Sequence, residues 1–333
     1  MTVTVSILGG GFMGAAHATN YKALGDRVRV KTVASRASEK ATRTADSVGA
    51  ELIEDLDEAI RDPEVDAVDI CLPTSLHRTF AEQAFDAGKH VFLEKPIALT
   101  GEDADAIVAA AERSGKILMV GLVLRFWPEY VELQRLVSAG ELGRPRAVSA
   151  LRLSPPADWN DWMADRSQSG GTPVDLMIHD LDQMNWLLGA PRSIYASEPA
   201  PGHVHAVVEY DGACGIAEAS MSMPRSYPFS SNVRVLCEGG VAEYAFSAAP
   251  IEGEGNIGAS SSARGLRIYP VDGEPATVAV ESADPWGPEI EEFVSCLEQG
   301  RAPEQGTGEQ ATLALLTSLA VARSLSSGRP ESV

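Results

Sequence analysis

Lys95 stands where a short apolar strand should end, and its neighbours make it a candidate for chemistry. The run Val91-Phe92-Leu93 leads into Glu94, Lys95 and Pro96, a pattern typical of a buried strand that brings a charged pair to the edge of a sheet. The proline fixes φ and removes a backbone donor, so the chain leaves this edge in a defined direction. A lysine held there is either ion-paired by Glu94 or takes part in a reaction, and the rest of the sequence must decide.

A second group of reactive residues follows a glycine turn. Gly170 and Gly171 precede Asp175 and His179, which lie four residues apart in a segment that we expect to be helical from Asp175 to Leu188. Residues at this spacing share one face of a helix. The alternative is an aspartate that favours the helix dipole beside a structural histidine.

Together with Lys95, this pair can act on an alcohol. The pKa of histidine, about 6.5, suits a general base, and a lysine ammonium stabilises a developing alkoxide in a desolvated cleft. Asp175 can orient the substrate or His179. Whether Lys95 or His179 finally takes the hydroxyl proton stays open.

A glycine-rich turn near the N-terminus predicts dinucleotide binding. Gly9, Gly11 and Gly14 fit the pattern G-x-G-x-x-G, with Phe12 and Met13 between the last two, and they follow the apolar run 3–8. The first glycine permits a tight turn, the second lets the backbone approach a pyrophosphate, and the third lets helix and strand pack closely. The helix that follows offers N–H groups to the phosphates.

The end of the second strand favours NADP over NAD. An NAD site usually has Asp or Glu about 20 residues after the glycines, bound to the ribose 2′-hydroxyl, whereas this chain has Ala34-Ser35-Arg36. Ser35 and Arg36 can donate to a 2′-phosphate. Stacking of Arg36 on the adenine would leave NAD usable.

The turn after the third main strand is a candidate wall of the same cofactor site. Leu72, Pro73 and Thr74 leave that strand, and we expect them beside the nicotinamide ribose, with Thr74 or Ser75 capping the next helix. His77 is either a cofactor contact or a surface or capping histidine.

Strand and helix patterns alternate through the first 122 residues. Expected strands are Val3–Leu8, Val28–Ala34, Val65–Leu72, His90–Glu94 and Ile117–Leu122, and expected helices are Phe12–Leu24, Ser38–Val48, Asp55–Arg61, Leu76–Ala87 and Gly101–Ser114. Repeated units of this kind build a doubly wound parallel sheet. We therefore predict a Rossmann domain over residues 1–122.

Strands follow strands in the remainder, residues 123–333. Helices are expected at Tyr130–Ala139, Pro288–Glu298 and Gly308–Ser326, and strands at Arg144–Leu153, Val204–Tyr210, Gly215–Met223, Asn232–Cys237, Gly240–Phe246, Gly265–Tyr269 and Thr277–Val280, with a loop over Ala248–Arg264. This order predicts an α+β domain with a mainly antiparallel sheet. We expect the last helix to pack back on the first domain.

Bulk properties bound the class of protein. A chain of 333 residues suggests two domains, and its net charge of −20 argues against nucleic acid as a partner. No run of 18 apolar residues predicts a membrane span, and the chain begins without a leader pattern. The four scattered cysteines, Cys71, Cys214, Cys237 and Cys296, predict reduced thiols in a cytoplasmic enzyme and no metal site.

Taken in order, the glycine turn, Glu94-Lys95-Pro96 and Asp175-x-x-x-His179 resemble the glucose–fructose oxidoreductase/inositol dehydrogenase/rhizopine-catabolism (Gfo/Idh/MocA) family. The resemblance covers nearly the whole length, and it also includes 87–98, 121–126, 141–145 and 291–293. The local match is tightest to inositol-dehydrogenase-like members. Many relatives carry glycine where Met177 stands, a departure that would narrow the pocket.

This resemblance implies a Rossmann domain followed by a domain with a large, open, mainly antiparallel sheet, which pairs subunits into homodimers or homotetramers. It implies an NAD(P)-dependent oxidoreductase acting on a secondary hydroxyl of a sugar, inositol or related polyol. Lys95 would contact the substrate hydroxyl and the cofactor, with Asp175 and His179 opposite.

Weaker candidates and other classes of function complete the expectations. Arg125, Trp159 and Trp162 are weaker candidates for the wall of the substrate pocket. Two alternatives remain: a dinucleotide-sensing protein without turnover, and a hydrolase or lyase that uses bound NAD transiently.

Overall fold

The chain forms two compact units. The computed structural model describes residues 2–156, 161–248, 261–281 and 284–333. One unit comprises Met1–Phe126 with Asp284–Thr312, and the other comprises Trp127–Ala283 with Leu313–Val333. Each unit is described below by itself.

A six-stranded parallel sheet forms the first unit, in the order β3-β2-β1-β4-β5-β6. The strands are β1 Val3–Leu8, β2 Val28–Ala34, β3 Glu51–Ile53, β4 Ala67–Ile70, β5 His90–Glu94 and β6 Leu118–Gly121. This doubly wound arrangement confirms the predicted fold class. The sequence pattern missed β3, because three residues at the sheet edge are too few to show a period of two.

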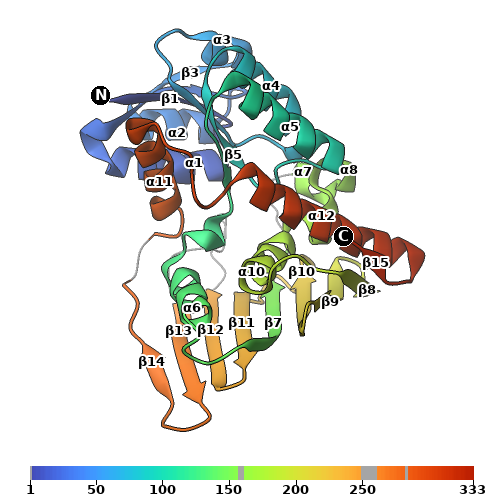
Figure 1. Ribbon diagram of the computed structural model, residues 1–333. Coiled ribbons are helices and arrows are strands. Elements are labelled where there is room, and N and C mark those ends of the chain that lie inside the picture. Colours follow the sequence, from blue (N-terminus) through green and yellow to red (C-terminus); the bar gives the residue numbers. More distant parts are fainter. Residues whose placement is uncertain (1, 157–160, 249–260, 282–283) are drawn as a thin grey trace. The chain divides into compact units, whose positions relative to one another are not determined.

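Helices connect these strands (Figure 1). They are α1 Phe12–Ala23, α2 Glu39–Val48, α3 Leu56–Arg61, α4 His77–Asp86, α5 Gly101–Ser114 and α11 Gly287–Gln299, with short 3₁₀ turns η1 Gly25–Arg27, η2 Thr74–Leu76 and η3 Val123–Arg125. Side-chain caps start several of them where the sequence provides an oxygen. Ser38 accepts from the N–H of Ala41, and Thr100 accepts from that of Asp103.

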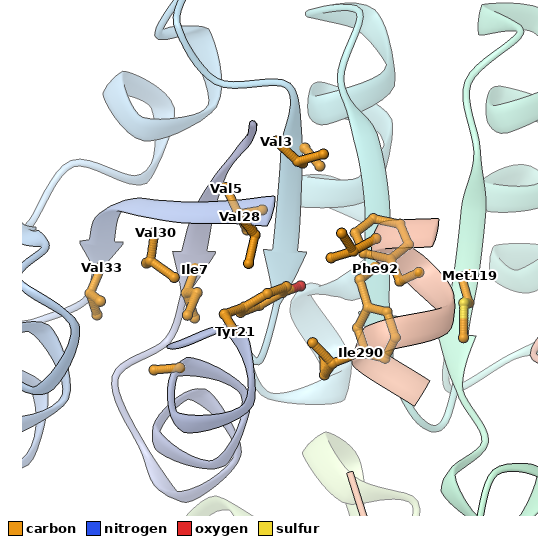
Figure 2. Close-up of a cluster of buried hydrophobic side chains, with 14 of the residues drawn as sticks. Val3, Val5, Ile7, Tyr21, Val28, Val30, Val33, Phe92, Met119 and Ile290 are labelled. Atoms are coloured by element: carbon orange, nitrogen blue, oxygen red, sulfur yellow. The ribbon is translucent and has the colours of Figure 1, made fainter. Parts of the chain in front are cut away.

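The core of this unit lies between the sheet, α1 and α11. Figure 2 shows Tyr21 of α1, Phe92 of β5 and Ile290 of α11 converging on the same interior as the valines of β1 and β2. Ile290, Phe293 and Val294 of α11 are fully buried, at the i, i+3, i+4 spacing of one helical face. Helix α11 therefore completes the first unit although it lies far along the chain.

The two closing helices belong to different units. Helix α11 belongs to the first unit, and the final helix, α12 Gly308–Ser327, belongs to the first unit up to Thr312 and to the second unit from Leu313 onward. Its Ser324 accepts a hydrogen bond from the N–H of Ala196, and its Thr317 accepts one from Asn185. Both partners lie in the second unit.

A nine-stranded sheet dominates the second unit, in the order β14-β13-β12-β11-β7-β10-β9-β8-β15. The strands are β7 Pro145–Leu153, β8 Ser193–Ala200, β9 His203–Tyr210, β10 Ala213–Ser220, β11 Phe229–Cys237, β12 Gly240–Ala248, β13 Ser261–Pro270, β14 Ala276–Val278 and β15 Glu331–Ser332. Of the paired strands, β7 and β10 are parallel and the rest are antiparallel. The large, mainly antiparallel sheet is confirmed, although β8 and β15 were not foreseen. The expected loop over Ala248–Arg264 ends earlier than predicted, because β13 begins at Ser261, and its residues 249–260 lie outside the described ranges.

The helices that precede β8 in this unit are α6 Pro128–Ser138, α7 Asp161–Ala164, α8 Arg166–Ser169, α9 Gly171–Asp175 and α10 Ile178–Leu188. Helix α10 packs on β7 and β10, and α6 packs on β12. A chain of edge-to-face rings joins Trp127 and Tyr130 to Tyr244 and Phe246. Such contacts fix the helices on the sheet.

The other face of the sheet alternates with the covered one along each strand. On β9 the residues 204, 206, 208 and 210 are buried, whereas 205, 207 and 209 are exposed. Four large apolar side chains of this face are 45–51% exposed, namely Tyr195, Val207, Ile216 and Leu236. Within the described residues, no helix is both long and apolar enough to cross a bilayer.

Candidate active site

The glycine turn has the geometry that each glycine was expected to provide. Gly9 has φ +109°, and a Cβ there would lie 2.4 Å from the carbonyl oxygen of Cys71. A Cβ on Gly14 would lie 1.9 Å from the Gly9 oxygen. These two positions accept no side chain, because backbone fills the space.

Gly11 differs from them, since a Cβ there would meet nothing within 4 Å. It is the N-cap of α1, and no side chain caps that helix end. Open space in front of a helix N-terminus, with the start of α1 at its base, fits the pyrophosphate of a dinucleotide. The residues present therefore fit this cofactor class.

Ser35 and Arg36 follow β2 beside this turn. Ser35 is half-buried and its N–H donates to the carbonyl of Ile53, while Arg36 is exposed. No carboxylate stands at this strand end, as the sequence indicated.

The turn after β4 is built differently from the prediction. Thr74 begins the 3₁₀ turn η2, whose N-cap is Pro73 without a side-chain hydrogen bond, so neither Thr74 nor Ser75 caps α4. Thr74 is buried, and the helix proper starts at His77. Pro73 has no backbone N–H to satisfy, and the 3₁₀ turn that follows supplies backbone hydrogen bonds, so the start of the helix needs no side-chain cap.

His77 joins two strand ends. Its Nδ1 lies 2.9 Å from the carbonyl oxygen of Pro96, and its Nε2 lies 2.9 Å from that of Leu72. Burial lowers the pKa of His77, and the two carbonyls oppose this. The ring therefore ties the Leu72-Pro73 turn to the segment after Lys95, which favours a structural role.

Glu94 acts on the backbone of Lys95. Its Oε2 accepts the N–H of Lys95 at 2.9 Å. Glu94 is buried, Lys95 is half-buried, and the Lys95–Pro96 peptide bond is cis. Lys95 lies at the carboxyl end of β5, two strands from β1 and its glycine turn. Both groups therefore lie at the same edge of the parallel sheet, where ligands of such sheets bind.

His17 connects Glu94 to the centre of the sheet. Its Nδ1 lies 2.9 Å from Asp69 Oδ2, and its Nε2 lies 3.2 Å from Glu94 Oε1. The second contact is an ion pair and not a well-aligned hydrogen bond. Because each ring nitrogen faces a carboxylate, both are best satisfied as N–H groups, which makes the ring an imidazolium.

The electrostatic environment of this cluster also favours an imidazolium at His17. Burial, the largest single influence, would lower the pKa of His17, but the negative charge of Asp69, the neighbouring Cys71 and the hydrogen bonds to both together raise it well above its usual value. Burial also raises the pKa of the Cys71 thiol, which stays protonated 3.3 Å from His17 Nδ1. Glu289 of α11 is fully buried without a hydrogen-bond partner among the described residues, and burial followed by the charge of Glu94 raises its pKa well above the usual range.

Asp175 and His179 lie in the second unit, in a segment that is not one continuous helix. Helix α9 ends at Asp175, two turn residues follow, and α10 begins at Ile178. The carbonyl of Thr172 accepts from the N–H of Leu176 at 3.2 Å and also from that of Met177 at 2.9 Å. The second bond spans five residues, so it widens the turn as a π-type bulge does. The expected helix from Asp175 to Leu188 is corrected accordingly.

A buried ion pair fixes the start of α10. Arg152 of β7 donates through Nε and Nη2 to both oxygens of Asp180 at 3.0 Å. Burial would lower the pKa of Arg152, and the Asp180 charge raises it above its usual value. This bidentate pair sets the position of α10 on the sheet. His179, half-buried beside it, and buried Asp175 are thereby held on a rigid support.

The weaker candidates for the wall of the substrate pocket lie in different units. Arg125 is buried in the first unit and donates to Gln305 at 2.8 Å. Trp162 is half-buried in α7, and Trp159 lies outside the described residues. Lys95 and Arg125 thus belong to the first unit and Asp175, His179 and Trp162 to the second.

Sequence reasoning missed His17, Asp69 and Glu289. A signal existed for Asp69, because it interrupts the apolar strand Ala67-Val68-Asp69-Ile70, and a charge in a parallel strand buried on both faces requires a partner. His17 follows Gly14 on the helix of the glycine turn, which faces that sheet. Glu289 gave no signal, since it resembles an ordinary acid in the first turn of a helix.

Family models match both halves of the chain. Residues 3–122 match the model described as "Oxidoreductase family, NAD-binding Rossmann fold", and residues 130–243 match the "GFO/IDH/MocA C-terminal domain". This chain belongs to the GFO/IDH/MocA family. It is accordingly a member of an oxidoreductase family with a dinucleotide-binding Rossmann domain, as the motifs indicated.

Individual GFO/IDH/MocA proteins support this membership. The chain is 31% identical to scyllo-inositol 2-dehydrogenase (NAD(+)) of Bacillus subtilis (strain 168) over 69% of this chain and 71% of that protein. It is 29% identical to inositol 2-dehydrogenase of Rhizobium meliloti (strain 1021) over the whole of both. The crystal structure of aldose-aldose oxidoreductase from Caulobacter crescentus complexed with glycerol matches with a TM-score of 0.84 and 25% identity over all of both chains. Alignments with some other curated relatives span only 46–58% of their length.

Two glycine variants should separate cofactor binding from folding. Gly14→Ala is expected to lower the free energy of unfolding by about 1–3 kcal/mol or more, because its methyl would overlap the Gly9 carbonyl. Gly11→Ala should change stability by less than about 1 kcal/mol. It should nevertheless weaken dinucleotide binding at least about tenfold, because its methyl fills the space proposed for phosphate. Urea unfolding and cofactor titration measure the two effects, and normal cofactor affinity in Gly11→Ala would contradict this placement.

His17→Gln should destabilise the first unit in a pH-dependent way. The variant leaves a buried carboxylate without its cation, which costs about 3–5 kcal/mol near neutral pH. Because folding raises the pKa of His17, its contribution is complete below the unfolded-state pKa of about 6.5 and is lost as the pH rises through the native value. The free energy of unfolding should therefore fall more steeply with rising pH in the wild type than in His17→Gln. Equal slopes, or a neutral ring in ¹⁵N NMR spectra at pH 7, would exclude the imidazolium.

Proposed function

We propose that this chain is an NAD(P)-dependent oxidoreductase that interconverts a secondary alcohol and a carbonyl. The observation that carries the proposal is the position of Lys95 at the carboxyl end of β5, on the same sheet edge as the glycine turn. A dinucleotide held at Gly11 would run along this edge. It would supply the acceptor or donor of the hydride.

Sugars, inositols or related polyols are the proposed substrates. Support comes from relatives whose names specify inositol dehydrogenation, one of them aligned over the full length of this chain. A polyol presents several hydroxyls, so a site for it needs donors and acceptors from more than one direction. Lys95, Asp175 and His179 are the proposed donors and acceptors, and Arg125, Trp159 and Trp162 are proposed for the pocket wall.

Each catalytic side chain has a distinct proposed task. The Lys95 ammonium stabilises negative charge on the reacting oxygen, and Glu94 holds the Lys95 backbone through the hydrogen bond to its N–H. His179 is the proposed base for the hydroxyl proton, because an imidazole is the side chain best suited to accept and release a proton near neutral pH. Asp175 orients the substrate or the His179 ring.

Lys95→Ala should lower kcat roughly 100- to 1,000-fold, because the reacting oxygen loses its charge partner. Cofactor affinity should change far less. Lys116→Ala is the matched control, since Lys116 precedes β6 at the amino edge of the sheet. The assay follows reduced nicotinamide absorbance over a panel of sugars, inositols and keto-sugars. Full kcat in Lys95→Ala would refute the catalytic role.

The same assay separates the other classes of function. A dinucleotide-sensing protein would bind cofactor but turn over no member of the panel, and Asp175→Asn would change nothing. A hydrolase or lyase would form product without net reduction of the cofactor. Either result would replace the dehydrogenase proposal.

We propose NADP as the preferred cofactor. Support comes from the absence of a carboxylate after β2 and from exposed Arg36 beside Ser35. Leu72, Pro73 and Thr74, with Phe12 and Met13, would line the remaining cofactor surface. His77 would hold that loop in place.

Arg36→Ala should raise the KM for NADP roughly 10- to 100-fold, the value of a charge-assisted hydrogen bond, and leave that for NAD unchanged. Arg43→Ala is the control, because Arg43 lies on α2 nearby but ion-pairs with Glu39. A wild-type kcat/KM that favours NAD tenfold would overturn the choice of cofactor.

The open face of the large sheet is the proposed subunit interface. Its exposed Tyr195, Val207, Ile216 and Leu236 form an apolar surface suited to a second copy, in a homodimer or homotetramer. A cytoplasmic location is proposed from the free thiols, since Cys71, Cys214, Cys237 and Cys296 form no disulfide in the structure.

A further inference from the structure

Two histidines and a glutamate converge on one point of the large sheet. His203 and His205 lie two residues apart on β9, and Glu218 lies on β10 directly opposite His205 in the strand register. The Nε2 atoms of the two histidines are 3.1 Å apart, and Glu218 Oε1 lies 3.3 Å from His203 Nε2. The three ligand atoms lie within 4.8 Å of one another.

Hydrogen bonding alone satisfies this arrangement poorly. His203 Nε2 carries either one hydrogen or one lone pair. If it carries the lone pair, it accepts from His205 but faces the Glu218 oxygen without a proton between them. If it carries the hydrogen, that single hydrogen must serve both neighbours at once. A single cation removes the conflict, because the two Nε2 atoms and the Glu218 oxygen can each direct a lone pair to it.

The spacing also matches a known coordination geometry. Zinc–nitrogen distances of about 2.0–2.1 Å and tetrahedral angles place neighbouring ligand atoms roughly 3.3 Å apart. The two separations of 3.1 and 3.3 Å that involve His203 Nε2 are therefore close to the edges of a zinc tetrahedron. Two imidazoles and a carboxylate form a donor set that zinc and similar borderline ions prefer over calcium or magnesium.

We propose that His203, His205 and Glu218 bind a divalent transition-metal ion, with zinc as the best fit and the fourth position open to water. The site is separate from Asp175 and His179 within the second unit. A Cβ on Gly215 of β10 would lie 2.7 Å from Met184 of α10, so α10 covers the face of β10 that carries Gly215. Glu218, three residues along the same strand, points to the other face. The ion would clasp β9 to β10 on that face.

The other clusters of possible ligands are less suited to an ion. Within the described residues they are His17 with Asp69 and Cys71, and His17 with Glu94 and Glu289. His17 is fully buried and each of its nitrogens is already paired with a carboxylate. An ion there would have to displace the proton that holds each pair. Within the single chain, the cluster on β9 and β10 is partly exposed, and only one of its three residues is a carboxylate.

Isothermal titration of the chelator-stripped, full-length protein with zinc chloride tests the site. One ion per chain should bind with micromolar or tighter affinity. His205→Gln and Glu218→Gln should each weaken binding by more than the roughly 10- to 100-fold that losing an outer-shell partner costs. Zinc should raise the Tm of the wild type and not that of either variant, because only binding to the folded state stabilises it.

Glu209→Gln is the matched control. Glu209 lies on the same exposed face of β9 as His205 and bonds to Ser193, so the variant removes an equal charge without touching the three ligands. It should bind zinc as the wild type does. Circular dichroism verifies that the variants are folded, and the two ligand variants on different strands test the site independently.

Three results would overturn the proposal. They are no zinc binding by the wild type, undiminished binding in both His205→Gln and Glu218→Gln, and one ion per two chains, which would make it a site shared between subunits. Cofactor binding and turnover are measured in parallel. Failure of the dehydrogenase assay would leave the titration result unaffected.

Discussion

A buried imidazolium between two carboxylates is the constraint on which the first unit depends. His17 rises from the helix that begins at the glycine turn, Asp69 belongs to β4, and Glu94 ends β5. One ring therefore links the element that would hold the dinucleotide to the strand end that carries Lys95. The cost of burying these charges is offset only while all three remain in contact. A displacement of the start of α1 would therefore change the position of Lys95.

The parallel sheet brings the remaining groups to the same edge. In such a sheet every strand ends on one side, so the turns after β1, β2, β4 and β5 meet there although they are far apart in sequence. Backbone contacts complete the assembly. His77 joins the turn after Leu72 to Pro96, and Gly9 lies against the carbonyl of Cys71. The proposed cofactor surface is therefore made of loops that hold one another.

The second unit is built on a mainly antiparallel sheet whose two faces differ in their surroundings. One face is covered by α6 and α10. The Arg152–Asp180 ion pair fixes the first turn of α10, which carries His179. The wide turn at Met177 changes the spacing between Asp175 and His179 from that of a regular helix. The other face remains available for a subunit and for an ion. Because side chains alternate between the two faces along β9 and β10, the proposed metal ligands lie on the face opposite to helix α10.

The features that could be predicted from the sequence are those that depend on short-range sterics and periodicity. The alternation of strands and helices, the separate need for Gly9, Gly11 and Gly14, and the strand-end position of Lys95 are all visible within windows of a few residues. Each depends on local backbone geometry or on a repeat of buried positions. The same local patterns carry the resemblance to the GFO/IDH/MocA family.

The contacts between residues far apart in the sequence depend on tertiary packing. Asp69 lies 52 residues from His17, α11 returns to the first unit, and Glu218 meets His205 through the register of β9 and β10. The five-residue hydrogen bond at Met177 and the burial of Glu289 likewise depend on packing. A local pattern shows that a charged residue needs a partner, but strand order, register and helix docking select that partner.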